Sequence, residues 1–151
     1  MGLDTTHGAW HGAYSAFYRW RKEIANFAGY PPLELMDGYY SEDDFYLLER
    51  LFPNVDDTAM FKFRSIKKQF PIKWDCLKSS PLNVLLLHSD CEGDISPEDC
   101  KGIADALIEL MPLIPEDIDC GGHIGNLRKK TQTFIDGCLE AFNKNEKLEF
   151  H

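Results

Sequence analysis

The sequence predicts a mainly helical fold, a single compact domain over residues 1–151. The sequence also allows one small β-hairpin, and a hairpin would make the fold class α+β. Apolar residues recur at helical spacing in several stretches. Two of these stretches follow a serine–proline pair, which is typical of a helix start. With a hydrophobic fraction of 44%, a chain of 151 residues can bury a core of its own.

A first helix is predicted over residues 8–28, because Gly29 and two prolines follow it as stop signals. One stripe of this helix is apolar and is expected to face the core. A second stripe, about a third of a turn away, mixes aromatic and polar side chains and suits the wall of a groove. The members of this second stripe are His7, His11, Tyr14, Tyr18 and Arg21.

The middle of the chain is expected to hold two shorter helices, over residues 41–52 and 56–68, each after acidic or capping residues. Residues 60–64 also alternate between apolar and polar side chains, as a strand does. Residues 60–75 therefore stay open between helix and strand.

Serine–proline pairs at residues 80–81 and 96–97 predict two further helices, because proline is favoured at the first helical position. The first of these ends near residue 87, and the second directs Asp105 and Glu109 outward.

The last predicted helix covers residues 124–142 and has a buried apolar stripe. Gly137 lies next to that stripe and is expected to let another helix approach closely, since it has no Cβ.

Charge is unevenly distributed over a chain whose net charge is −9. Residues 90–119 hold ten acids and one base, and residues 62–78 hold six bases and one acid. An acidic chain without a broad basic face opposes nucleic-acid binding. No apolar run is long enough for a membrane span, so no membrane partner is expected.

Cysteine usage indicates a reducing compartment. The chain has five cysteines, an odd number, and no Cys-x-x-Cys pair. This pattern argues against a disulfide framework and against a thiolate zinc site, and it favours the cytoplasm.

The densest group of reactive side chains lies in residues 88–94, which hold a histidine, a thiol and three acids. Because a helix is predicted on each side, residues 88–99 resemble a twelve-residue calcium loop. A divalent cation would be held by Asp90, Glu92, Asp94 and Asp99. His88 at the first ligand position fits calcium poorly, so a metal-free loop without a cofactor is also expected.

Catalysis is a second alternative for the same residues. His7 and His11 are four positions apart, which on a helix would place both rings on one face. Together with His88 and Asp90 they would form a metal-dependent hydrolase. A nucleophilic Cys91 is disfavoured, because the neighbouring carboxylates raise the pKa of a thiol.

A binding pocket without chemistry is the preferred hypothesis. Aromatic rings of the first helix would stack on a small polar or nucleotide-like ligand, and the central loop would hydrogen-bond it. The residues assigned to this pocket are His7, Trp10, His11, Tyr14, Tyr18, Arg21, His88, Ser89 and Asp90.

The segments at residues 2–7 (GLDTTH), 10–15 (WHGAYS), 88–93 (HSDCEG) and 148–151 (LEFH) resemble a family of uncharacterised bacterial and bacteriophage proteins. The resemblance spans the chain and brings no established activity. It implies a small intracellular, phage-encoded protein of a kind that inhibits a host protein or sequesters a small signal.

Three hypotheses follow: a non-enzymatic binding protein for a small polar ligand or a host protein, the metal-dependent hydrolase, and an acidic protein–protein interaction domain. The first two require the start of the first helix and the loop after residue 87 to be neighbours in space. The oligomeric state is left open.

Overall fold

The computed structural model describes residues 2–38, 56 and 71–151. The chain divides into two compact units, which are described separately. Unit 1 comprises Met1–Gly29 with Ser79–His151, and unit 2 comprises Tyr30–Lys78. The helices predicted over residues 41–52 and 56–68, and the alternating residues 60–64, lie outside the described residues apart from Asp56.

The prediction of one helix over residues 8–28 is wrong at its start. Helix α1 spans Tyr14–Phe27, and an antiparallel pair of strands, β1 (Gly2–Asp4) and β2 (His11–Ala13), precedes it. A 3-10 turn, η1 (Thr6–Gly8), lies between the two strands. Left-handed φ angles of 60° at His7 and 65° at Gly8 interrupt any continuous helix.

The helix starts predicted from serine–proline pairs are confirmed. Helix α4 spans Leu82–Leu87, and helix α5 spans Pro97–Leu110. The Ser96 hydroxyl accepts a hydrogen bond from the backbone N–H of Asp99 at 3.1 Å, as an N-cap does. A 3-10 turn, η4 (Met111–Leu113), follows α5.

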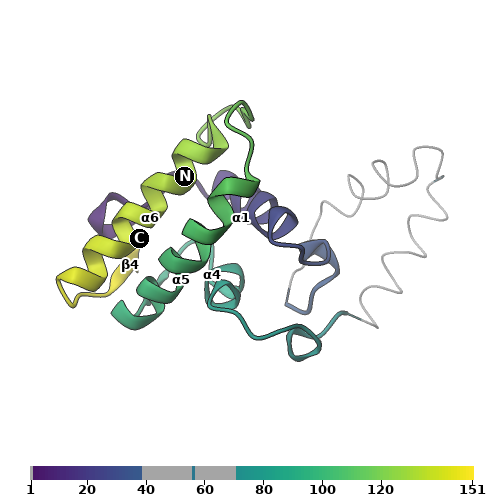
Figure 1. The fold of residues 1–151 in the computed structure, drawn as a ribbon, viewed down its shortest axis with the longest axis horizontal. Coiled ribbons are helices and arrows are strands. Elements are labelled where there is room, and N and C mark those ends of the chain that lie inside the picture. The colour runs from purple at the N-terminus through teal and green to yellow at the C-terminus, as the bar shows by residue number, and fades with distance from the viewer. Residues whose placement is uncertain (1, 39–55, 57–70) are drawn as a thin grey trace. The chain divides into compact units, whose positions relative to one another are not determined.

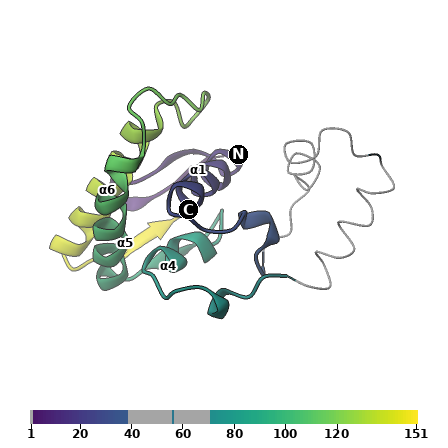
Figure 2. The same cartoon turned by 45° about the vertical axis from the view of Figure 1, so that its right-hand side comes forward.

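Helix α6 spans Leu127–Asn143 and begins three residues later than predicted, after the N-cap Asn126. Helices α5 and α6 lie side by side in both views (Figures 1 and 2). The predicted close approach at Gly137 is confirmed, although the neighbour is the turn after η1 and not a helix. A Cβ built on Gly137 would lie 2.4 Å from the Ala9 Cβ.

A second antiparallel pair joins distant parts of the chain. Strand β3 (Gly93–Ile95) pairs with β4 (Leu148–Phe150). The backbones of Asp4 and His151 also exchange two hydrogen bonds, of 2.8 and 2.9 Å. In the described residues, four α-helices and two small antiparallel sheets make the fold compatible with an α+β class. The helical part of the prediction holds, and the single hairpin underestimates the strand content.

The core of unit 1 is aromatic. Trp10 lies edge-on to Phe17, with ring centroids 5.1 Å apart, and Trp20 lies 4.8 Å from Phe134. Phe150 of β4 joins this cluster at 5.6 Å from Phe17. Burial of such rings is the main source of stability for a unit of this size.

Unit 2 is described at its two ends. A 3-10 turn, η2 (Leu33–Leu35), leads to a bridge between Met36 and Ile72, and a second turn, η3 (Trp74–Cys76), follows. The Trp74 indole donates to the Asp37 carbonyl at 2.8 Å. Among the residues that the structure describes, no helix has the length and apolar character that crossing a bilayer would take.

Candidate functional site

Arg21 joins helix α1 to the loop after α4. Its side chain is 2% exposed, and its guanidinium forms an ion pair with Asp90. The same group donates to the carbonyls of Leu85, Leu86 and His88 at 3.3, 3.2 and 2.5 Å. The last carbonyls of a helix lack partners within it, so the planar guanidinium satisfies them as a C-terminal cap. The expected proximity of the first helix and this loop therefore holds for Arg21.

The central loop is bonded mainly to itself. The two ring nitrogens of His88 lie 2.9 Å from the Ser89 carbonyl and 3.3 Å from the Asp94 carbonyl. The ring also packs on Phe150, with centroids 4.1 Å apart. The Ser89 hydroxyl accepts from the Cys91 backbone N–H at 3.2 Å. These contacts hold the shape of the loop and occupy groups that were assigned to a ligand.

The four carboxylates assigned to a cation are dispersed. Asp90 is engaged by Arg21, and Asp94 lies 3.5 Å from the ammonium of Lys147. Asp99 belongs to the first turn of α5, and Glu92 is exposed. Within residues 2–38, 56 and 71–151, no three His, Cys, Asp or Glu side chains gather in a way that could hold a metal ion. A calcium loop is not assembled by these residues.

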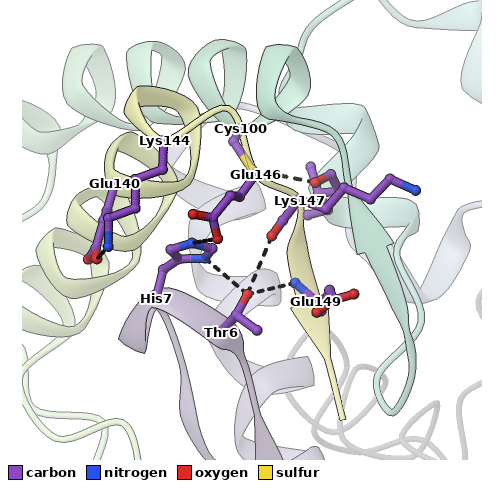
Figure 3. A network of polar contacts seen from close by, with 9 residues as sticks. Thr6, His7, Cys100, Glu140, Lys144, Glu146, Lys147 and Glu149 are labelled. Carbon is purple, nitrogen blue, oxygen red and sulfur yellow. Dashed lines mark hydrogen bonds and ion pairs between the residues drawn. The ribbon is translucent and has the colours of Figure 1, made fainter.

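His7 connects η1 to the segment before β4 through side-chain contacts (Figure 3). Its side chain is 7% exposed, and its Nε2 lies 3.2 Å from the Glu146 carboxylate. Its Nδ1 lies 3.0 Å from the Thr6 hydroxyl, which also accepts from the Glu149 backbone N–H at 2.9 Å. His7 and Thr6 therefore position β4 beside the N-terminal strands.

An ion pair on the last turn of α6 lies near this contact (Figure 3). Lys144 donates to the Glu140 carboxylate at 2.7 Å. The hydrogen bond from Lys144 lowers the pKa of the Glu140 carboxyl, and the same hydrogen bond raises the pKa of Lys144.

His11 lies on a different element from His7 and has a different partner. It is exposed in β2 and pairs with Asp4 of β1. The prediction that both imidazoles share one helix face is therefore wrong, because neither residue lies in a helix that continues into α1. The ligand set of the proposed hydrolase is not brought together.

The aromatic residues of the predicted pocket differ in exposure. Trp10 is 1% exposed, so its ring belongs to the core. The ammonium of Lys130 lies 4.2 Å above that ring and donates to the His11 carbonyl at 2.9 Å. Tyr14 and Tyr18 are partly buried, and Lys22 lies 5.2 Å from the Tyr18 ring. Sequence reasoning missed Lys130, whose pKa is lowered by burial.

The outward face of α5 and the turn that follows it is acidic. Asp105 and Glu109 are exposed, as predicted, and the Asp105 carboxylate accepts a hydrogen bond from the Lys101 ammonium at 2.5 Å. We name as the acidic surface the exposed carboxylates of α5, of the segment before it from residue 92 and of the segment after it to residue 119: Glu92, Asp94, Glu98, Asp99, Asp105, Glu109, Glu116, Asp117 and Asp119. Two exposed apolar side chains accompany them, Ile108 at 47% and Leu113 at 63%.

Comparison with known proteins adds no relative. No protein-family model, curated protein or solved structure matches the chain.

Proposed function

We propose that the protein is a non-enzymatic binding protein whose acidic surface receives a basic segment of a partner protein. The observation that carries this proposal is the scarcity of internal counterions. In the described part of the chain, Glu92, Glu98, Glu109 and Asp117 take part in no ion pair. These groups remain available to lysine and arginine side chains of another molecule.

Helix geometry concentrates these charges. Glu98, Asp105 and Glu109 fall on one side of α5, opposite the buried residues Cys100 and Leu107. Complementary charge accelerates encounter and selects the partner, while exposed apolar side chains supply burial area. Ile108 and Leu113 provide such apolar area in the same region.

A small-ligand pocket receives less support from the same structure. Trp10 is in the core, and Arg21 satisfies backbone carbonyls and Asp90. Both residues were assigned to ligand recognition, and both are used by the fold itself. A macromolecular partner on an exposed surface needs neither residue.

Zero-length crosslinking tests this proposal. A carbodiimide couples carboxylates only to amines in direct contact, so it reports on acid–lysine contacts. The tagged protein is treated in bacterial cells, and the linked peptides are identified by mass spectrometry. We expect crosslinks from Glu98, Asp105 or Glu109 to lysines of one stoichiometric partner.

A matched pair of variants controls for net charge. Glu98→Gln with Glu109→Gln is expected to weaken capture of that partner at least tenfold and to make the remainder more sensitive to salt. Asp136→Asn with Glu149→Gln removes the same charge from exposed positions elsewhere and should retain capture. Equal capture by both variants would contradict the proposal.

A further inference from the structure

The four short strands of unit 1 lie side by side. Strand β1 pairs with β2, and β4 pairs with β3. The mutual hydrogen bonds of Asp4 with His151 and a bridge between Thr5 and Phe150 join β1 to β4. The order of the strands is therefore β2, β1, β4, β3. Within the described part of the chain, each of the outer strands, β2 and β3, has one edge that no other strand covers.

The backbone of Asp94 is directed toward the uncovered edge of β3. The N–H and C=O groups of one strand residue point to the same side, and successive residues alternate. His151 bonds to β1, so the backbone of Phe150 faces β3. Glu149 faces β1 again, and its N–H donates to the Thr6 hydroxyl at 2.9 Å. Because Asp94 lies opposite Glu149 in the ladder, its N–H and C=O point away from β4.

Both outward groups of Asp94 can take a further hydrogen bond. Its carbonyl lies 3.3 Å from the Nε2 of His88, and a carbonyl oxygen has a second lone pair. Among the residues that the structure describes, no acceptor receives the Asp94 N–H. Gly93 and Asp94 are exposed. An uncovered strand edge is a template for another strand, so Asp94 can exchange two backbone hydrogen bonds with an added one.

The two outer edges differ in charge. Asp4 bonds to β4, so the backbone of His11 opposite it faces outward from β2. The ammonium of Lys130 occupies the His11 carbonyl at 2.9 Å, and a lysine in this place protects an edge. Strand β3 instead lies between two acids, Glu92 directly before it and Glu98 in the first turn of α5, and neither forms an ion pair with another described residue. The edge of β3 therefore favours a positively charged strand, and the edge of β2 repels one.

We propose that the basic segment of the partner protein adds to the outer edge of β3 as an extended strand. This inference rests on the function proposed above and specifies how the partner binds. Backbone hydrogen bonds to Asp94 supply affinity, and lysine or arginine side chains near Glu92 and Glu98 supply selectivity. The partner segment is therefore expected to hold a short run of β-branched residues between basic ones.

Two heptapeptides of equal charge test the backbone contact. The first has the sequence Val-Thr-Val between two pairs of lysines, and the second has the same sequence with its three central residues N-methylated, which removes their donors. With the full chain labelled with nitrogen-15, we expect the first peptide to slow hydrogen exchange of the Asp94 amide. The N-methylated peptide should bind about tenfold more weakly, as expected for the loss of one or two hydrogen bonds. Equal binding of the two peptides would overturn the proposal.

Two variants at one position separate the backbone donor from the charge. Asp94→Asn keeps the N–H and loses the carboxylate, whereas Asp94→Pro loses both. This N–H lies outside the ladder of β3 with β4, so both variants should fold, as their melting temperatures will show. Asp94→Pro should bind the unmethylated peptide about tenfold more weakly than Asp94→Asn does. Equal affinities would overturn the proposal, and the two peptides decide it on the original protein if the proline variant does not fold.

The partner found by crosslinking distinguishes this inference from the function on which it rests. If Asp94→Pro captures that partner as well as Asp94→Asn does, while Glu98→Gln with Glu109→Gln loses it, the acidic surface binds the partner and strand addition is wrong. If the original protein captures no partner and binds neither peptide, the proposed function fails and this inference fails with it.

Discussion

Arg21 and Asp90 are 69 positions apart in the sequence and form an ion pair. This ion pair joins the middle of α1 to the loop that follows α4. The guanidinium is buried, whereas the carboxylate is partly exposed. The Nη1 group of Arg21 donates to carbonyls at the end of α4, so one side chain fixes the direction in which the chain leaves that helix.

Arg21→Met should therefore be strongly destabilising. The substitution removes the guanidinium donor from the carbonyls at the end of α4 and leaves Asp90 without its cation, at a cost of about 3 kcal/mol in the free energy of unfolding. Arg19→Met, on the exposed side of the same helix, is the matched control and should cost far less. Urea denaturation followed by circular dichroism measures both. A similar loss for the two variants would show that Arg21 is not the cap of α4.

His7 provides a test of backbone conformation. Its φ of 60° is left-handed, which asparagine tolerates and a β-branched residue does not. His7→Val should be less stable than His7→Asn by about 1–2 kcal/mol, since both lose the ring but only one strains the turn. Chemical denaturation measures the difference. Equal stabilities would mean that the turn relaxes when the ring is removed.

Gly137→Ala should destabilise unit 1 even though alanine favours helices. The added methyl group would overlap Ala9, and overpacking of this kind costs about 1–3 kcal/mol. Ala9→Gly removes the methyl group on the other side of the contact and should restore part of the loss in the double variant. Thermal melts of the single and double variants measure these losses of stability. Purely additive losses would contradict the contact between Gly137 and Ala9.

Lys130 should make the free energy of unfolding depend on pH in the alkaline range. Burial lowers the pKa of its ammonium from the ordinary 10.5, so the folded state binds this proton less tightly than the unfolded state does. Stability should rise relative to Lys130→Met as pH increases from the lowered pKa toward 10.5. Urea unfolding across this pH range measures the free energy of unfolding of the original protein and of Lys130→Met. A constant difference between the two proteins at every pH would contradict a lowered pKa of Lys130.

Local chemistry explains which elements were predictable. The start of α4 depends on a serine and a proline, and the start of α5 depends on a serine, a proline and two acids of its first turn. These signals lie within a few positions of each other, and both starts were predicted. The start of α1 was misplaced because helical periodicity does not reveal the left-handed angles at His7 and Gly8. The pairing of β3 with β4 was missed because Ile95 and Leu148 are far apart in sequence and neither three-residue strand has a pattern of its own.

The candidate site, too, could be predicted only in part from the sequence. Proximity of Arg21 to the central loop was expected, but its role as a helix cap depends on packing that a sequence pattern does not contain. Trp10 was assigned to ligand stacking as one of the aromatic rings of the predicted first helix, and only the folded core shows that its ring is covered.

The mutual hydrogen bonds between Asp4 and His151 have a kinetic consequence. The two residues are 147 positions apart in the sequence. Closing so large a loop is entropically costly and slows folding, so this contact is expected to form late on the folding pathway. Until this contact forms, the aromatic rings that Phe150 covers, Phe17 among them, stay open to water and to association with other partly folded chains.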